Sequence, residues 1–243
     1  DDRVERFGED THACAKWLAS QLPELACLID AARVPALPER SLPACDIHFD
    51  DGIPGRKRLQ IEAFAGHMPA ATTPVLEWCA GKGHLGRRVA LADRVPVLSL
   101  EIDPALCADT VRLAARMGMD QRVVCADAFD EAAHAHARGH SVLALHACGD
   151  LHVRLLQLAS HTGCQQLAVA PCCYNRIQSD NYHALSSTAQ ASSLRLSKDD
   201  LGLPLSETVT AGTRVRRLRD QSMARRLGFD LLQRELRGID EYL

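Results

Sequence analysis

The stretch that decides the fold is residues 75–86, Val-Leu-Glu-Trp-Cys-Ala-Gly-Lys-Gly-His-Leu-Gly. It begins as an apolar run, typical of a buried strand, that ends in Glu77. A glycine-rich turn follows, in which Gly81, Gly83 and Gly86 have the G-x-G-x-x-G spacing, and a helix is expected behind it. Such a turn lets the backbone approach a nucleotide closely, and the helix start offers unpaired N–H groups to a polar ligand.

Strand and helix patterns alternate on both sides of this turn. Strands are expected at 74–79, 95–101, 121–125, 141–147 and 165–170, with helical segments at 56–67, 84–92, 104–117, 128–138 and 151–161. Strongly apolar strands separated by helices predict an α/β fold with a Rossmann-like, doubly wound, mostly parallel sheet that is covered on both faces.

The two ends of the chain differ from this central pattern. Helical spacing predicts an N-terminal helical extension over residues 1–33, and frequent Pro and Gly predict a linker up to residue 55. We therefore predict an extension at 1–55 and a catalytic domain at 56–243, with a serine-rich insertion at about 176–211. A basic helix is expected at about 213–227, ending at Gly228, with a final strand or helix in the tail.

Composition limits the classes of protein that fit. The chain has 243 residues, 47% of them hydrophobic, and shows no apolar run long enough to span a bilayer and no leader. Ten cysteines without a C-x-x-C pair predict a reduced, cytoplasmic protein rather than a disulfide scaffold. The net charge of −3 gives no overall nucleic-acid signature.

Acidic residues close the first three expected strands, where ligands bind in a doubly wound sheet. Glu77 closes the first strand, and Glu101, which can accept hydrogen bonds from ribose hydroxyls, closes the second. The third runs into Asp127-Ala128, where a carboxylate can receive an adenine amino group. Each acid has a structural alternative, because Glu101 can cap the helix at Pro104 and Asp127 can be a helix N-cap.

This arrangement serves either NAD or S-adenosylmethionine, since both present an adenosine ribose to the second strand. Glu77 favours S-adenosylmethionine, because a carboxylate helps to hold a cationic amino-acid end and would repel a pyrophosphate. An NAD-dependent oxidoreductase remains the alternative. The predicted cofactor-binding residues are Glu77, Cys79, Gly81, Lys82, Gly83, Leu85, Glu101, Ile102, Asp127, Ala128 and His146.

Three motifs together resemble a known family. They are Glu-Trp-Cys-Ala-Gly-Lys-Gly-His-Leu at 77–85, Leu-His-Ala-Cys-Gly-Asp-Leu at 145–151 and Ala-Pro-Cys-Cys-Tyr-Asn at 170–175. They are similar to the signatures of class I S-adenosylmethionine-dependent methyltransferases of a methyltransferase-like group and, more distantly, of tRNA ribose 2′-O-methyltransferases. The resemblance covers about residues 55–175.

The resemblance implies a methyltransferase that acts on RNA, in particular tRNA. A protein or small-molecule acceptor, and a non-catalytic protein that binds adenosylmethionine or RNA, remain alternatives. The sequence departs from the family pattern at two places: Cys79 stands where many members have a glycine, and Tyr174-Asn175 replaces the paired histidines of the tRNA enzymes. The zinc modules of those enzymes are also missing from this sequence.

Methyl transfer needs a nucleophile placed behind the methyl group and a group that accepts its proton. The predicted catalytic residues follow the fourth and fifth strands: His146, Asp150, Cys172, Cys173 and Tyr174. His146 or Asp150 is the expected base, although Asp150 can instead cap the helix that begins at Leu151. Lys82 is expected near the carboxylate of the donor or the oxygen of the substrate.

Cys148, Cys172 and Cys173 follow neighbouring strands and, with His146 or His152, suggest a zinc site as one alternative. We predict no metal, because side chains of adjacent residues diverge and no C-x₂₋₄-C spacing is present. A nucleophilic cysteine is a second alternative. The thiols are expected to shape the pocket.

The expected C-terminal helix carries a cluster of arginines. They are Arg214, Arg216, Arg217, Arg219, Arg225 and Arg226. Such a cluster either contacts RNA phosphates or forms a solvated outer face, and the sequence leaves both open.

Overall fold

The structure is a computed structural model that describes residues 10–31, 34–46, 48–206 and 213–238. Its centre is a five-stranded, all-parallel sheet with the order β3-β2-β1-β4-β5. The strands are β1 (Val75–Trp78), β2 (Val97–Glu101), β3 (Gln121–Cys125), β4 (Ser141–Leu145) and β5 (Gln166–Ala170). The predicted doubly wound α/β fold is confirmed, and all five strands lie within one or two residues of their expected ends.

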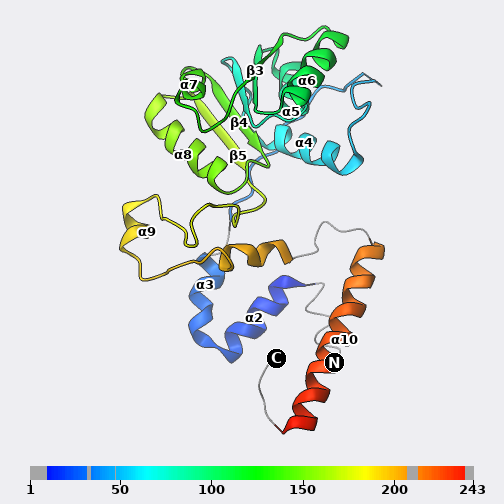
Figure 1. The fold of residues 1–243 in the computed structure, drawn as a ribbon, viewed down its shortest axis with the longest axis vertical. Helices are drawn as coiled ribbons and strands as arrows, with labels where there is room; N and C mark the ends of the chain where they lie inside the picture. The colour runs from blue at the N-terminus through cyan, green and yellow to red at the C-terminus, as the bar shows by residue number, and fades with distance from the viewer. Residues whose placement is uncertain (1–9, 32–33, 47, 207–212, 239–243) are drawn as a thin grey trace.

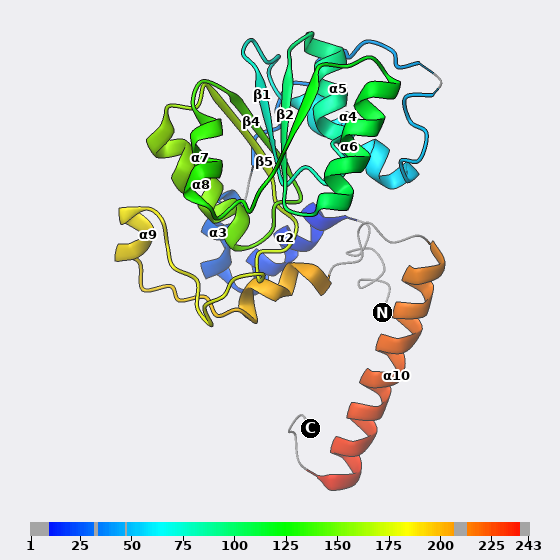
Figure 2. The same ribbon diagram turned by 45° about the horizontal axis from the view of Figure 1, so that its top comes forward.

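Helices cover both faces of the sheet (Figures 1 and 2). On one face lie α4 (Gly55–His67), α5 (His84–Asp93) and α6 (Pro104–Arg116). On the other lie α8 (Asp150–Thr162) and α7 (Glu131–His134), which a 3₁₀ turn at Ala135–Ala137 extends. The order of the strands reverses between β1 and β4, so the chain connections leave a crevice at the carboxyl end of β1.

Alternating side chains of the strands build two hydrophobic clusters, one under each helical layer. Leu76 and Trp78 face α7 and α8, where they pack with Leu155. Val75, whose side chain alternates with that of Leu76, faces α4 and α5 and packs with Val89. All five side chains are completely buried (0% exposed). Burial of each large aliphatic side chain contributes about 1.5–3 kcal/mol to folding stability. The rigid sheet therefore fixes the positions of the residues that follow each strand.

The N-terminal segment is helical where it is described. It forms α2 (Thr11–Gln21), a 3₁₀ turn at Pro23–Leu25 and α3 (Ala26–Ala31). The α-helix is interrupted at Pro23, because proline cannot donate a backbone hydrogen bond. Residues 1–9, also expected to be helical, lie outside the described residues. The following linker is tied to the domain by Arg40, which pairs with Asp93 and donates to the Ala65 carbonyl at 3.1 Å.

After β5 the chain forms the expected irregular insertion, which contains α9 (Ser187–Ala191), a 3₁₀ helix at Asp200–Ser206 and an isolated antiparallel bridge between Asn181 and Ser197. It precedes α10 (Thr213–Arg237), which does not end at Gly228 as expected. A glycine inside a helix costs only about 1 kcal/mol relative to alanine, so the helix formers around it carry the helix through. The C-terminal stop is instead followed by Gly238, with φ +65°.

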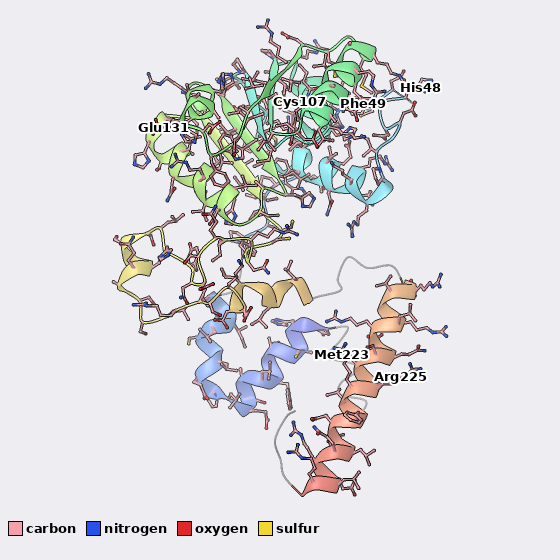
Figure 3. All side chains as sticks on the ribbon, viewed as in Figure 1. His48, Phe49, Cys107, Glu131, Met223 and Arg225 are labelled. Atoms are coloured by element: carbon pink, nitrogen blue, oxygen red, sulfur yellow. The ribbon has the colours of Figure 1, made fainter. Side chains whose placement is uncertain are left out.

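Helix α10 extends away from the sheet in both views (Figures 1 and 2), and Met223 and Arg225 project from it (Figure 3). Both of these side chains are exposed. Within the described ranges, no helix has the length and apolar character required to cross a bilayer.

Candidate active site

The turn after β1 has left-handed backbone at three alternate residues: Cys79 (φ +55°), Gly81 (φ +59°) and Gly83 (φ +65°). A Cβ at Gly83 would lie 2.4 Å from Nε2 of Gln121, so the turn packs tightly against the domain there. A Cβ at Gly81 would have nothing within 4 Å. Gly81 therefore presents bare backbone to open space, where a ligand can approach it.

A pocket of about 160 Å³ lies beside this turn. It contains five of the predicted site residues, namely Glu77, Cys79, Gly81, Leu85 and His146. The sequence reasoning missed the others: Lys57, Ile61, Trp78, Ala80, His84 and Leu145. Lys57 and Ile61 come from α4, which precedes β1. The only feature of the sequence that indicated a functional role for this helix is its run of three basic residues at 56–58.

Glu77 is buried beneath the turn instead of reaching freely into the pocket. Its carboxylate accepts hydrogen bonds from the Ser99 hydroxyl at 3.0 Å and from the backbone N–H of Gly86. Burial raises the pKa of Glu77 to about 7, although these hydrogen bonds and the nearby Arg87 oppose the shift. Glu77 thus joins β1, β2 and the start of α5.

We expect Glu77→Gln to flatten the pH dependence of folding stability. The native pKa of about 7 exceeds the ordinary value of 4.5, so the native state binds more protons between those pH values. The contribution of Glu77 to folding stability is therefore greatest below pH 4.5 and falls as the pH rises toward 7, by up to about 3 kcal/mol. Urea unfolding of both chains from pH 4.5 to 8 measures this, and equal pH slopes would contradict the assignment.

Glu101 holds the same turn from β2. Its carboxylate accepts hydrogen bonds from the backbone N–H groups of Gly81 at 2.8 Å, Ile102 at 3.0 Å and Asp103 at 3.1 Å. The cap of α6 is Asp103, which accepts from Ala105 N at 2.8 Å. The alternative reading of Glu101 as a helix cap is therefore wrong, and its carboxylate stays at the strand end beside the turn.

Asp127 likewise is not a helix N-cap, because Asp130 occupies that position before α7. Asp127 accepts a hydrogen bond from Phe129 N at 2.9 Å and lies at the end of β3. At the same edge the apolar side chains of Ile102 and Phe129 are 60% and 44% exposed, whereas Ala128 is buried. The edge that runs from Glu101 to Asp127 therefore offers both carboxylates and an apolar surface.

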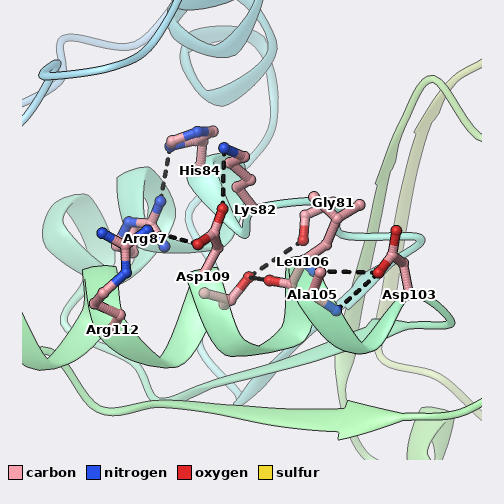
Figure 4. Close-up of polar contacts among 10 residues, drawn as sticks. Gly81, Lys82, His84, Arg87, Asp103, Ala105, Leu106, Asp109 and Arg112 are labelled. Atoms are coloured by element: carbon pink, nitrogen blue, oxygen red, sulfur yellow. Dashed lines mark hydrogen bonds and ion pairs between the residues drawn. The ribbon is translucent and has the colours of Figure 1, made fainter.

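Lys82 is not among the residues that line the pocket, and its side chain reaches Asp109 (Figure 4). Its Nζ lies 3.0 Å from Oδ2 of Asp109 on α6, and Thr110 of the same helix donates to the Gly81 carbonyl at 3.2 Å. The expected position of Lys82 near the donor carboxylate or the substrate oxygen stays a prediction, and without a ligand Lys82 pairs with Asp109. On the other side of the turn, Arg87 lies 2.7 Å from Nδ1 of His84, and burial together with Arg87 lowers the pKa of His84 to about 4.

His146 follows β4 with a strained backbone, φ +66°. Its Nε2 lies 3.1 Å from Oε1 of Gln60, which fixes the ring beside the pocket. Burial, followed by the charges of Lys57 and Arg56, lowers the pKa of His146. The imidazole is therefore neutral near pH 7 and able to accept a proton.

The other predicted catalytic residues lie outside this pocket. Asp150, the first residue of α8, accepts from Gln178 N at 2.8 Å and lines a separate cavity of about 340 Å³ with the insertion. Tyr174 is half exposed and contacts the ring of His152 edge-on, with ring centres 5.7 Å apart. Cys172 and Cys173 cluster with Cys148 in the turns after β5 and β4.

Comparison with known families agrees with this geometry. Residues 58–180 match a family model described as a methyltransferase domain. The chain belongs to this methyltransferase family. The matched segment begins in α4, contains all five strands of the sheet and ends after the cysteine cluster. The prediction of a class I methyltransferase domain is thus confirmed, whereas none of the curated proteins matches the sequence.

Solved structures share parts of the fold. They include an RNA methyltransferase from Salinibacter ruber in complex with S-adenosyl-L-homocysteine (16% identity, TM-score 0.38, covering 49% of this chain and 72% of that one). TrmK of M. capricolum, in complex with the same compound, has 8% identity and a TM-score of 0.35, covering 44% and 47%. The cyclopropane synthase MmaA2 of Mycobacterium tuberculosis has 16% identity and a TM-score of 0.37, covering 49% and 44%.

The chain therefore spans about half the length of the TrmK and MmaA2 chains. These similarities are too low to carry an argument about the substrate, and the three proteins differ in what their names say they do.

Proposed function

We propose that this chain binds S-adenosylmethionine at the carboxyl ends of β1, β2 and β3 and transfers its methyl group to a nucleophile on RNA. The observation that carries the proposal is the turn after β1. Gly81 leaves open space above the backbone, and Glu101 lies within 2.8 Å of it at the end of the next strand. This pairing supports a ligand that combines a small amino-acid end with a ribose.

The size of the pocket fits one end of such a ligand. Its 160 Å³ is below the roughly 300–1,000 Å³ typical of complete ligand sites, so it can hold the methionine end alone. The adenosine then lies along the open edge, with Glu101 at the ribose hydroxyls and Asp127 and Ile102 at the adenine. When bound, the cofactor supplies an electrophilic methyl group on a cationic sulfur.

Carboxylates favour this donor over a dinucleotide. Glu77 and Glu101 both lie at the turn that precedes α5, where a pyrophosphate would have to bind. The negative charge of Glu101, and that of Glu77 when its carboxyl is ionised, would repel a pyrophosphate and attract a sulfonium or ammonium group. The negative charge at the turn and the match to a methyltransferase family both disfavour the alternative function of an NAD-dependent oxidoreductase.

His146 is the group best suited to accept the proton of the methyl acceptor. Its ring is held by Gln60, lines the pocket and is neutral near pH 7 because burial lowers its pKa. Asp150 faces the insertion and is hydrogen-bonded to Gln178. We therefore assign the base to His146 and a structural role to Asp150.

Positive charge beside the pocket supports RNA as the acceptor. Arg56, Lys57 and Arg58 begin α4, and Lys57 lines the pocket. A cationic helix start that adjoins the reaction site would receive phosphates that flank the target nucleotide. Exposed arginines of α10 carry further positive charge: Arg214, Arg217, Arg225 and Arg226. All ten cysteines are free, which is consistent with the proposed cytoplasmic location.

Calorimetry with S-adenosylmethionine, S-adenosylhomocysteine and NAD tests the cofactor. We expect binding of the first two and none of NAD, whereas binding of NAD alone would overturn the proposal. Labelled methyl transfer into total RNA, with total protein as the comparison, then tests the acceptor. Binding without transfer to either pool would favour the non-catalytic alternative.

We expect Glu101→Ala to weaken binding of S-adenosylmethionine by about 1–3 kcal/mol, because a charged acceptor is lost and the Gly81 N–H loses its partner. The measurement is calorimetry, with circular dichroism to establish that the variant is folded. Asp120→Ala is a matched control, since this carboxylate is exposed and lies at the opposite end of β3. Unchanged affinity in folded Glu101→Ala would remove Glu101 from the site.

A further inference from the structure

Three cysteines converge beside the methyl-transfer pocket. Sγ of Cys148 lies 3.0 Å from Sγ of Cys172, which lies 3.5 Å from Sγ of Cys173. All three sulfur atoms lie within 4.8 Å of one another. In the part of the chain that the structure describes, no other group of three metal-ligating side chains comes together in this way.

The backbone explains why the two adjacent cysteines share a target. The sequence-based expectation that their side chains diverge assumes strand geometry, but β5 ends at Ala170. Cys172 and Cys173 lie in the irregular turn that follows, where the alternation of a strand no longer applies. Their sulfur atoms consequently face the same point.

Hydrogen bonds hold the two turns together independently of the thiols. Gly149 N donates to the Cys173 carbonyl at 2.9 Å, and Asp150 N donates to the Arg176 carbonyl at 3.1 Å. On the other side of the cluster, His146 N donates to the Ala170 carbonyl at 2.9 Å. The cluster is therefore preorganised by the fold, as an intact ligand site requires.

We propose that Cys148, Cys172 and Cys173 bind one Zn²⁺ ion as thiolates, with the fourth position open to solvent. A Zn–S bond of about 2.3 Å and tetrahedral angles place sulfur atoms about 3.8 Å apart. The observed separations of 3.0 Å, 3.5 Å and no more than 4.8 Å bracket that value. The sulfur atoms therefore need to shift by only about 1 Å to reach coordination geometry.

Three protein ligands and one open position are the arrangement of reactive zinc sites, whereas structural sites use four. Cys172 is exposed, so the open position is reached from outside. Sγ of Cys148 donates to the His146 carbonyl at 3.2 Å, and His146 lines the pocket, so the two sites are neighbours. An ion here would fix the turns after β4 and β5 at the acceptor side. This site does not depend on the proposed cofactor or RNA.

The test uses the full chain, reduced, stripped of metal with a chelator and desalted under anaerobic conditions. Titration with Zn²⁺ against a chromophoric chelator should give one ion per chain. Co²⁺ should give thiolate-to-metal charge transfer in the near ultraviolet and the visible bands of tetrahedral cobalt. Cys172→Ser should weaken Zn²⁺ binding by at least about 100-fold, since even indirect supporting groups contribute 10–100-fold.

Cys27→Ser is the matched control, because Cys27 is an exposed free cysteine on α3 outside the cluster. It should bind Zn²⁺ as the unmodified chain does, and Zn²⁺ should raise the melting temperature of both but not of Cys172→Ser. Absence of Zn²⁺ binding by the reduced chain would overturn the proposal. So would undiminished binding by folded Cys172→Ser, or a cobalt spectrum without thiolate charge transfer.

Discussion

Gly149→Ala is expected to destabilise the domain by at least about 4 kcal/mol, a large share of the 5–15 kcal/mol typical of a native protein. Gly149 precedes α8 with φ +56° and ψ −127°, a conformation open to glycine but strained for residues with a Cβ. A Cβ there would lie 1.7 Å from the Arg176 carbonyl oxygen. Because that neighbour is backbone, relief requires the turns after β4 and β5 to separate.

Gly163→Ala is the matched control at the opposite end of α8. Gly163 also has a positive φ, +67°, but a Cβ there would meet nothing within 4 Å. Gly163→Ala should therefore lower the free energy of unfolding by only about 1–2 kcal/mol, which is the cost of left-handed backbone for a residue with a Cβ. Urea unfolding of both variants gives the comparison, and equal losses would show that the turns can separate without penalty.

The sheet was predictable from the sequence because its central strands, β1 and β4, are almost entirely buried and therefore apolar. In a strand such as Val97–Glu101, which lies between two helical segments and ends in an acid, the local sequence preference agrees with the place of the strand in the fold. The prediction of a helix end at Gly228 was wrong for the opposite reason. A glycine is a local signal, and the cooperative hydrogen bonding of the 25-residue α10 outweighs it.

The candidate site was predictable where it depends on strand ends and not where it depends on packing between distant segments. Glu77, Glu101 and His146 follow strands, so their neighbourhood could be derived from chain order. The pairing of Lys82 with Asp109, and the contact of Gln60 with His146 across 86 positions, depend on how helices pack on the sheet. Sequence patterns do not carry that information.

His146→Asn should lower kcat for methyl transfer by about 10²–10⁴-fold while leaving the affinity for S-adenosylmethionine nearly unchanged. Asparagine tolerates the left-handed backbone at φ +66°, so the turn should survive, although the shorter side chain gives up the contact of Nε2 with Gln60. It cannot accept a proton. The measurement is single-turnover transfer of labelled methyl to the RNA pool, with calorimetry of the donor alongside.

The pH profile separates a base from a merely structural residue. Burial lowers the pKa of His146, so the wild-type rate should fall only at acidic pH, when the imidazole becomes protonated. The residual rate of His146→Asn should lack that limb. His161→Asn, on the exposed end of α8, is the matched control and should retain both rate and profile. If instead Asp150→Asn removes the acidic limb and His146→Asn does not, the proton acceptor is Asp150, and the contact between Asp150 and Gln178 must open during the reaction.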